Sequence, residues 1–248
     1  HLPQVQGQVN FGLSADAAYL GLSALHLDFF DRRVRGDGAA AAPRVRYFLM
    51  GADEWRTCEH WPPEQARPHV LYLTSEGRAN TADGDGRLVP TPPGADRADE
   101  FVHDPADPVP TRGGRVAALG RLVGGPLDRS RVQARPDVLC YTTEPLARPL
   151  ELVGPVLLRL HTVAEAPAAD VVAKLTDVAP DGTALPLAEG ALRLGGVRGG
   201  GAEGSAAREP QERRIRLGHT AWRVPAGQRL RLEIAGSDYP QLGCATGD

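Results

Sequence analysis

The stretch RLRLEI at residues 229–234 decides the fold class of this chain. Apolar and charged residues alternate in it, so Leu230, Leu232 and Ile234 lie on one face of an extended strand. The two arginines and the glutamate lie on the opposite face. This period of two is typical of a strand in an antiparallel sheet whose apolar face covers a hydrophobic core.

Further β-like runs precede this strand and are separated by turn residues. They cover residues 70–74, 138–142, 150–153, 156–162, 171–178, 185–187, 213–217 and 222–224. Many short strands with Gly and Pro turns and no helices between them predict a mainly β fold, a jelly-roll β-sandwich of the galactose-binding-like type. We assign residues 63–248 to this domain. Within it, the Pro/Gly/Asp-rich stretch 76–127 is expected either to be a functional loop or to wrap over the surface. The Gly/Ala-rich stretch 198–208 is expected to be a flexible loop tip.

The first 62 residues have a different pattern. Residues 14–36 have the spacing of one amphipathic helix, with Ser14 as N-cap and Gly36 just past the C-terminus. Residues 45–50 (VRYFLM) form a nearly continuous apolar run, which is typical of a strand buried on both faces in a parallel sheet. A helix followed by such a strand is typical of an α/β domain. We therefore predict that residues 1–62 are the C-terminal remnant of an α/β domain.

Composition narrows the class of protein. The chain has 248 residues, 42% of them hydrophobic and 24% charged, which is ordinary for a soluble globular protein. A net charge of -3 argues against nucleic acid or an anionic membrane as a partner. Cys58, Cys140 and Cys244 are far apart in the sequence and odd in number, a pattern that is neither a disulfide framework nor a C-x-x-C metal site. This favours a reducing, cytoplasmic compartment. Because the chain does not begin with Met, we expect a processed product or a piece of a longer protein.

Two short motifs mimic ligand sites. Gly199, Gly201 and Gly204 have the spacing G-x-G-x-x-G, but they lie in a low-complexity run within a strand-rich region. A dinucleotide fingerprint needs a strand before it and a helix after it. Residues 83–86 (DGDG) lack the remaining ligands of a calcium loop and are expected to form a turn. The sequence therefore predicts neither a cofactor nor a metal ion.

A serine nucleophile is missing from the sequence. None of the six serines lies in G-x-S-x-G, the strained strand-to-helix turn of α/β-hydrolases. Ser14 comes nearest, but the final glycine of the motif is absent, and Ser14 is better interpreted as a helix cap. Cys58 is interpreted as an incidental thiol.

His1 is the candidate catalytic residue. It precedes a loop at residues 2–10, then Phe11-Gly12, the predicted helix and the apolar strand. In α/β-hydrolases the triad runs Ser, then Asp or Glu, then His, and the histidine lies on the loop before the last helix. A chain that opens at that histidine is expected to lack the other two triad members.

Many segments of the chain resemble the cocaine esterase / X-Pro dipeptidyl-peptidase family, which is also called the CocE/NonD acyl hydrolases. The matching segments are Phe11-Gly12, Phe29-Phe30-Asp31-Arg32, Gly36, 45–56 (VRYFLMGADEWR), Trp61-Pro62-Pro63, 72–80 (YLTSEGRAN), 101–111 (FVHDPADPVPT), 135–139 (RPDVL), Tyr141-Thr142, Pro145-Leu146, Gly154-Pro155-Val156, 170–175 (DVVAKL), Asp177-Val178, Pro180-Asp181-Gly182, 190–193 (GALR) and 227–240. The tail from Gln241 departs from the family pattern.

The resemblance implies an α/β-hydrolase core followed by the X-Pro dipeptidyl-peptidase C-terminal domain. It implies serine hydrolase chemistry on a small ester, amide or short peptide substrate, with a Ser-Asp-His triad of which only His1 lies in this chain. The serine, the acid and the oxyanion-hole donors are then expected upstream of residue 1. The chain alone is expected to be inactive. The sequence leaves open whether the protein is an esterase or a peptidase, and whether it forms a homodimer.

A non-catalytic β-sandwich module that binds carbohydrate or a protein partner is the rival interpretation, because jelly rolls also serve as lectin domains. The predicted helix and strand in residues 14–50 argue against it, since a separate module would not need them. The sequence upstream decides between the two: a G-x-S-x-G motif in a strand–turn–helix context supports the hydrolase.

Overall fold

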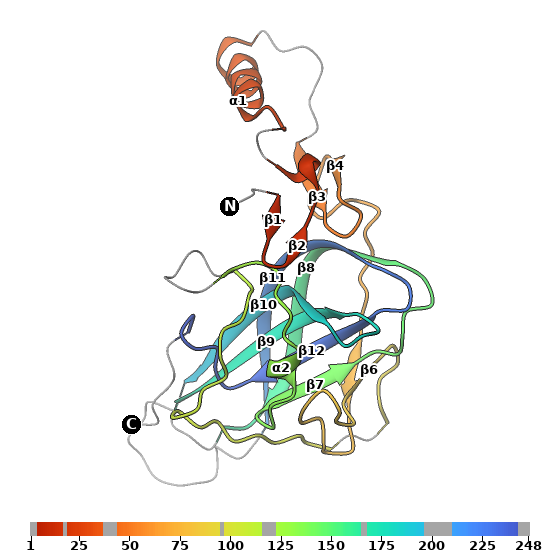
Figure 1. Cartoon of the computed structure of the whole chain (residues 1–248), viewed down its shortest axis with the longest axis vertical. Helices are drawn as coiled ribbons and strands as arrows, with labels where there is room; N and C mark the ends of the chain where they lie inside the picture. The colour runs from red at the N-terminus through yellow and green to blue at the C-terminus, as the bar shows by residue number, and fades with distance from the viewer. Residues whose placement is uncertain are drawn as a thin grey trace.

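The computed structural model describes residues 4–16, 19–36, 44–94, 97–115, 123–164, 168–195 and 210–242. Most regular structure in these residues is β, arranged as a sandwich with a smaller N-terminal part at one end (Figure 1). The mainly β fold predicted from the alternating pattern is confirmed. The Gly-rich stretch 198–208 and its G-x-G-x-x-G spacing lie outside the described residues.

The larger sheet of the sandwich has six strands in the order β10-β9-β12-β7-β6-β5. All its pairs are antiparallel except β6–β7. Its strands are β5 (Tyr72–Thr74), β6 (Arg87–Val89), β7 (Val138–Thr142), β9 (Ala168–Val178), β10 (Ala184–Gly195) and β12 (Arg229–Ala235). The helix α2 (Ser130–Gln133) lies over β7 and β12 on the outer side of this sheet (Figure 1).

The second sheet pairs β8 (Leu150–Thr162) with β11 (Gln211–Val224) in antiparallel register. The sequence pattern divided each of these long strands into two. The first predicted break, at residues 154–155, lies within β8. The second, at residues 218–221, lies within β11 next to a register shift between Arg216 and Gly218. Both strands therefore continue through glycines, Gly154 and Gly218, at which the sequence pattern predicts turns.

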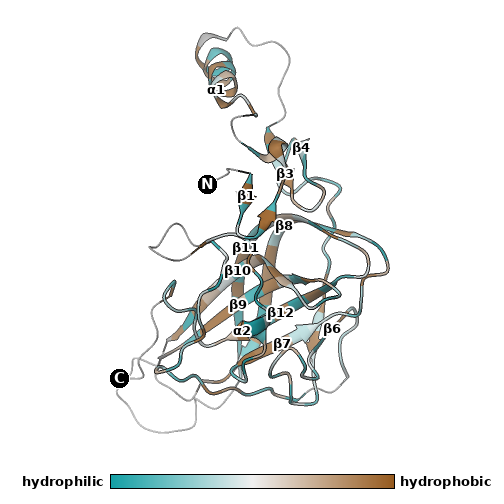
Figure 2. Cartoon of the chain, in the orientation of Figure 1, coloured by the Kyte–Doolittle hydropathy of each residue, from teal (hydrophilic) through white to brown (hydrophobic). Residues whose placement is uncertain are grey.

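The main hydrophobic core lies between the two sheets. Leu139, Leu232 and Ile234 from the large sheet pack with Leu158 and Ile215 from the small one. All five side chains are at most 6% exposed. Figure 2 shows apolar residues, in brown, along the central strands of the sandwich. The RLRLEI strand thus directs its leucines and isoleucine into the core, as its alternation predicts.

The strand predicted at residues 45–50 has a different environment from the one expected. β3 (Val45–Leu49) pairs antiparallel with β4 (Glu54–Cys58) in a hairpin. Met50 then exchanges main-chain hydrogen bonds with Ala221 and Arg223 at 3.0 and 2.8 Å, which attaches the hairpin to β11. The prediction of a parallel-sheet strand buried on both faces is therefore wrong. The apolar side chains of β3 instead lie on the covered face of an antiparallel hairpin. The domain boundary between residues 62 and 63 stays a prediction.

The predicted helix at residues 14–36 is broken into shorter pieces. A 3-10 turn spans Leu13–Ala15, the helix α1 spans Leu22–Phe30, and a π-helical turn spans Asp31–Arg35. Gly36 ends this segment in the left-handed conformation, with φ 73°, as predicted. Ser14 lies inside the 3-10 turn, so its prediction as N-cap of a long helix is wrong. Gly21 takes the N-cap position of α1 instead.

The remaining N-terminal elements are the short strands β1 (Val5–Gln6) and β2 (Val9–Asn10), which form a hairpin. This hairpin lies between α1 and the sandwich (Figure 1). Residues 83–86 form a turn before β6, as predicted, where Asp85 accepts a hydrogen bond from the Arg78 main chain at 3.2 Å.

Candidate functional site

The candidate catalytic residue His1 lies outside the described residues. The nearest described residue is Gln4, whose carbonyl accepts a hydrogen bond from the Phe11 N–H at 3.0 Å. This bond closes the β1–β2 hairpin. The structure therefore describes the hairpin that follows His1 in the sequence and the surfaces that this hairpin contacts.

The hairpin turn rests on the segment Gly125–Asp128, which leads into α2. The Gln8 N–H donates to the Pro126 carbonyl at 3.0 Å, and the Asp128 N–H donates to Gln8 Oε1 at 2.8 Å. The two backbones are so close that a Cβ on Gly7 would lie 2.8 Å from the Pro126 carbonyl carbon. A Cβ on Gly125 would lie 2.6 Å from the Gly7 nitrogen. Both positions require glycine, and both have positive φ angles.

The segment under the hairpin is itself held on the sandwich. The Asp128 carboxylate accepts hydrogen bonds from the main-chain N–H groups of Ser130 and Ala184, both at 3.0 Å, and from the Ser130 hydroxyl at 2.7 Å. Burial opposes ionisation, yet these donors outweigh it and lower the pKa of Asp128. The Arg129 N–H also donates to the Ala184 carbonyl at 2.9 Å. The hairpin therefore rests on a fixed surface.

Phe11 anchors the other end of the hairpin. Its side chain is only 5% exposed, and it packs at right angles against Phe48 of β3 and Trp222 of β11, with ring centroids 6.2 and 6.1 Å apart. Edge-to-face rings at this separation attract each other beyond their buried area. The Trp55 indole N–H also donates to the Ser14 carbonyl at 2.7 Å, which ties the next turn to β4.

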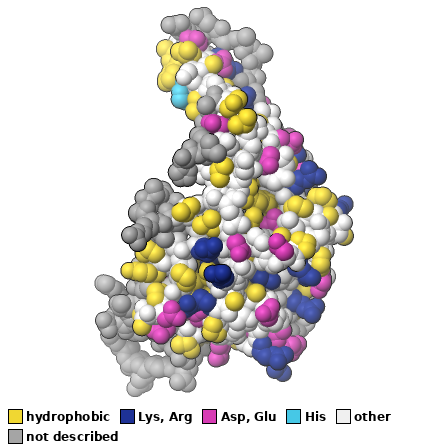
Figure 3. Space-filling view, in the orientation of Figure 1, with side chains coloured by type: hydrophobic (Ala, Val, Ile, Leu, Met, Phe, Trp, Pro, Cys, Tyr) yellow, Lys and Arg dark blue, Asp and Glu magenta, His cyan; other side chains and the backbone are white. Residues whose placement is uncertain are grey.

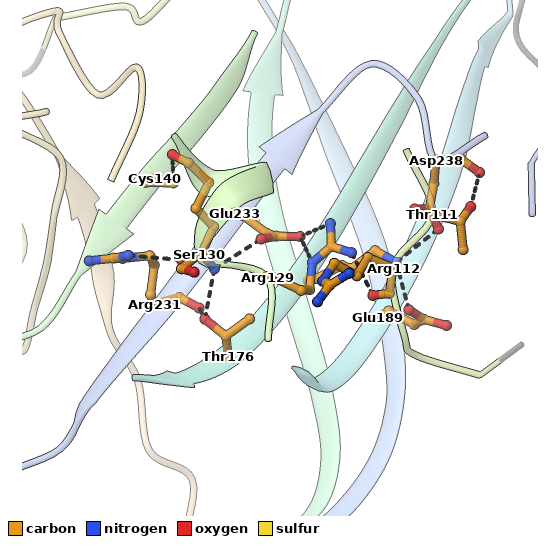
Figure 4. Close-up of polar contacts among 12 residues, drawn as sticks. Thr111, Arg112, Arg129, Ser130, Cys140, Thr176, Glu189, Arg231, Glu233 and Asp238 are labelled. Carbon is orange, nitrogen blue, oxygen red and sulfur yellow. Dashed lines mark hydrogen bonds and ion pairs between the residues drawn. The ribbon is translucent and has the colours of Figure 1, made fainter. Parts of the chain in front are cut away.

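A buried polar layer lies beneath α2, on the outer side of the large sheet (Figure 4). Arg129, which is 1% exposed, forms an ion pair with Glu233 of β12 at 2.6 Å. Gln133 donates to Glu233 at 3.0 Å and to Thr176 at 3.2 Å. On the charged face of the RLRLEI strand, Glu233 is thus covered by protein, whereas Arg229 and Arg231 are only partly buried. An alternating pattern alone does not reveal this, because it is also typical of a solvated face.

Lys174 is the single lysine of the chain and lies in the same layer. Its ammonium group bonds to Glu189 at 2.9 Å and to Asp238 at 2.8 Å, and all three residues are at most 4% exposed. Burial opposes ionisation of Glu189, but the Lys174 charge and hydrogen bonds from Arg115 and Gln241 lower its pKa to about 2. These charges form a buried network, in which Asp238 Oδ1 has no hydrogen-bond partner among the described residues.

Asp177 is a buried acid in a different setting. It lines a cavity of about 150 Å³ at one end of the sandwich, together with Gly51, Thr183 and Leu185. The Trp222 indole N–H donates to its carboxylate at 3.0 Å. Burial raises the pKa of Asp177 to about 6, and the bond from Trp222 offsets this only in part. Sequence reasoning missed this acid, because nothing in its neighbours marks it as buried.

The helix α1 exposes its apolar side chains. None of its residues is buried, and Leu27, Phe29 and Phe30 are 65%, 54% and 58% exposed. Hydrophobic side chains gather at this end of the molecule (Figure 3). Exposed apolar patches are typical of surfaces that bind protein, membrane or ligand, and of surfaces prone to aggregation.

The described residues contain no group of three or more His, Cys, Asp or Glu side chains that could hold a metal ion. Among the same residues, no helix is long and apolar enough to cross a membrane.

Residues 37–248 match the family described as the X-Pro dipeptidyl-peptidase C-terminal non-catalytic domain. The chain belongs to this family. As an X-Pro dipeptidyl-peptidase C-terminal domain protein it is 41% identical over 186 residues to the cocaine esterase of Rhodococcus sp. (strain MB1 Bresler). That match covers 74% of this chain and 32% of the esterase. The predicted family resemblance is confirmed, and the chain spans about a third of the length of this relative.

Two solved structures of hydrolases share the fold of this domain. An aminopeptidase from a marine sediment archaeon, Thaumarchaeota archaeon, superimposes with a TM-score of 0.76 at 25% identity, covering 98% of this chain and 41% of that one. An α-amino acid ester hydrolase superimposes with a TM-score of 0.67 at 26% identity, covering 86% of this chain and 37% of that one. The relatives of this domain are thus hydrolases of esters and peptides that are longer than the chain itself.

Proposed function

We propose that this chain is the C-terminal part of a serine hydrolase of the CocE/NonD type. The proposed activity is cleavage of acyl esters, amides or dipeptidyl substrates. The observation that carries the proposal is the family match over residues 37–248 together with the hydrolases among the relatives. The position of His1 ahead of Phe11-Gly12 and α1 supports its assignment as the triad histidine, because it agrees with the chain order of α/β-hydrolase triads.

In the proposed reaction a serine upstream of residue 1 attacks the substrate carbonyl carbon. His1 takes the serine proton as general base and gives it to the leaving alcohol or amine as the acyl–enzyme forms. A water molecule then attacks the acyl carbon and gives a proton to His1, which returns it to the serine oxygen as the bond to serine breaks and the acid is released. The upstream acid orients the imidazole, and the oxyanion-hole donors also lie upstream. The sandwich contributes a wall of the substrate pocket, since pockets form preferentially between domains.

The exposed apolar side chains of α1 support the hydrolase over a separate binding module. In the proposal, Leu27, Phe29 and Phe30 pack against the upstream hydrolase core. A stand-alone module would leave these three large side chains in water, where they favour aggregation.

Hydrolysis of a p-nitrophenyl ester tests the proposal. The purified 248-residue chain is expected to show no saturable turnover, and the longer protein that includes the upstream region is expected to show it. Saturable turnover by the chain alone would mean that the nucleophile lies within it. If the longer protein were inactive toward esters, aminoacyl amides and dipeptidyl amides, the binding module would be favoured.

A further inference from the structure

We propose that the cavity beside Asp177 binds a small organic cation, a primary ammonium ion that carries a short aliphatic chain. The cavity is lined by described residues of this chain. The proposal therefore does not rest on the proposed hydrolase function. It gives the domain, whose family is described as non-catalytic, a ligand of its own.

Asp177 is a buried acid without a cationic partner. It is only 5% exposed, and it forms no ion pair with any residue in the described part of the chain. Buried charges in proteins are ordinarily paired. The other buried acids of the described residues follow this rule, because each forms an ion pair with an arginine or a lysine: Asp137, Glu189, Glu233 and Asp238.

The hydrogen-bond donors that reach Asp177 are neutral. The Trp222 indole N–H donates to the carboxylate at 3.0 Å. The Gln228 amide, in the orientation that satisfies both of its ends, donates to the same carboxylate at 2.7 Å. These donors fix the carboxylate in place but bring no positive charge. A bound cation would supply the charge that the protein leaves out.

The cavity gives a ligand access to this carboxylate. Its volume is about 150 Å³, and it lies where β9 and β11 end and β10 begins. A cavity of this volume holds a molecule of about six non-hydrogen atoms. Ala179, Leu185 and Pro225 give the lining apolar surface. Such a lining suits an aliphatic chain, whereas a metal ion would need further oxygen ligands.

Arg223 is the other charged residue that lines the cavity. It is exposed to solvent, where water and salt screen its charge, and no ion pair joins it to Asp177 in the described ranges. An anionic ligand would have to lie beside the buried carboxylate of Asp177 and would be repelled by it. The charges around the cavity therefore favour a cation.

The test uses the longer protein that carries the upstream region. The probe is n-butylammonium, and 1-butanol is its uncharged counterpart of nearly the same shape. Asp177→Asn keeps the shape of the side chain and removes its charge. The control variant is Asp170→Asn, which removes the same charge from the other end of β9, where the carboxylate already pairs with Arg193 at 2.8 Å. Calorimetric titration measures both probes.

Wild type should bind butylammonium saturably, with a Kd of about 1 mM for so small a ligand. Its affinity for 1-butanol should be at least about 10-fold lower, and Asp177→Asn should weaken butylammonium by at least about 10-fold. Asp170→Asn should bind as wild type does.

The affinity for butylammonium should also depend on pH. The probe stays protonated in acid and at neutral pH, as a lysine does. Burial raises the pKa of Asp177 to about 6, so wild type should lose about 10-fold in affinity between pH 8 and pH 5 as the carboxylate takes up its proton. Asp177→Asn should show no such loss, because its amide does not titrate.

Four results would overturn the proposal. Equal affinity of butylammonium for wild type and Asp177→Asn would place the ligand at another site. Equal affinity of wild type for butylammonium and 1-butanol would make the cavity an apolar site. An equal loss in Asp170→Asn would make the effect one of net charge. The absence of saturable binding would mean that the cavity holds water only. Each result leaves the hydrolase proposal untouched, since ester turnover tests that separately.

Discussion

The ring of Phe11 meets the indole of Trp222 at 90°, with their centroids 6.1 Å apart. Phe11 follows the β1–β2 hairpin, and Trp222 lies 211 positions later in β11. The same indole donates a hydrogen bond to Asp177, so Trp222 joins the N-terminal part to a buried acid of the large sheet. This contact packs the end of the β1–β2 hairpin against the sandwich, and it leads to the first prediction.

Phe11→Ala should release the hairpin from the sandwich. Removal of a phenyl ring from a site that is only 5% exposed lowers the free energy of unfolding by about 3 kcal/mol. Amide hydrogen exchange at Gln8 and Phe11 should then accelerate by about 100-fold. Phe30→Ala is the control, because that ring is 58% exposed in this chain and should leave the exchange of the hairpin unchanged. Equal exchange in Phe11→Ala and wild type would show that the ring is not the anchor.

Lys174→Met should destabilise the sandwich strongly. Glu189 and Asp238 would keep two buried carboxylates without their shared cation, which costs about 3–5 kcal/mol in the free energy of unfolding. The control is Arg193→Met. That residue forms an ion pair with Asp170 from a side chain that is 62% exposed, so its loss should cost at most about 1 kcal/mol. Chemical denaturation measures both, and equal stability of the two variants would contradict the network.

The stability of the chain should depend on Asp177 between about pH 4 and 6. Its folded pKa of about 6 lies above the ordinary value of 3.8, so the folded state binds the proton more tightly than the unfolded state. The stabilisation that protonated Asp177 contributes is fully present below pH 3.8 and is lost as the pH rises through 6. Asp177→Asn removes this dependence, so the variant should gain stability relative to wild type from pH 4 to 7. A difference that stays constant over this range would contradict a raised pKa.

Glu189 should show the opposite dependence on pH. Its folded pKa of about 2 lies below the ordinary value of 4.5, so its contribution is present above pH 4.5 and is lost as the pH falls toward 2. Glu189→Gln should therefore be less stable than wild type at pH 7, and the two should converge near pH 2. Denaturation curves at several pH values check this, and a destabilisation that is the same at pH 7 and pH 2 would refute it.

Strand positions were predictable because their alternation is local, and β7 was predicted at its observed bounds, Val138–Thr142. Strand continuity was not predictable. Gly154 interrupts the apolar pattern of β8, but a Cβ there would lie 3.0 Å from Pro62, so the glycine permits a close approach inside a strand. The sequence alone does not distinguish such a glycine from one in a turn.

The apolar run of β3 shows a second limit of prediction from the sequence. Local hydrophobicity predicted burial on both faces, but whether a strand pairs parallel or antiparallel depends on which strand lies beside it. Here that strand is β4, only a short turn away. The supporting residues of the candidate site are unpredictable for the same reason, because Gln8 and Asp128 are 120 positions apart and neither belongs to a local motif.

The replacement His1→Ala in the longer protein that carries the upstream region tests the central claim most directly. The catalytic role predicts that kcat/KM for a p-nitrophenyl ester falls by about 10³-fold or more, by analogy with the loss of a triad member. Thermal unfolding and the circular dichroism spectrum should stay unchanged. A folded variant that retains kcat/KM within about tenfold of wild type would contradict the account and would make His1 an ordinary loop residue.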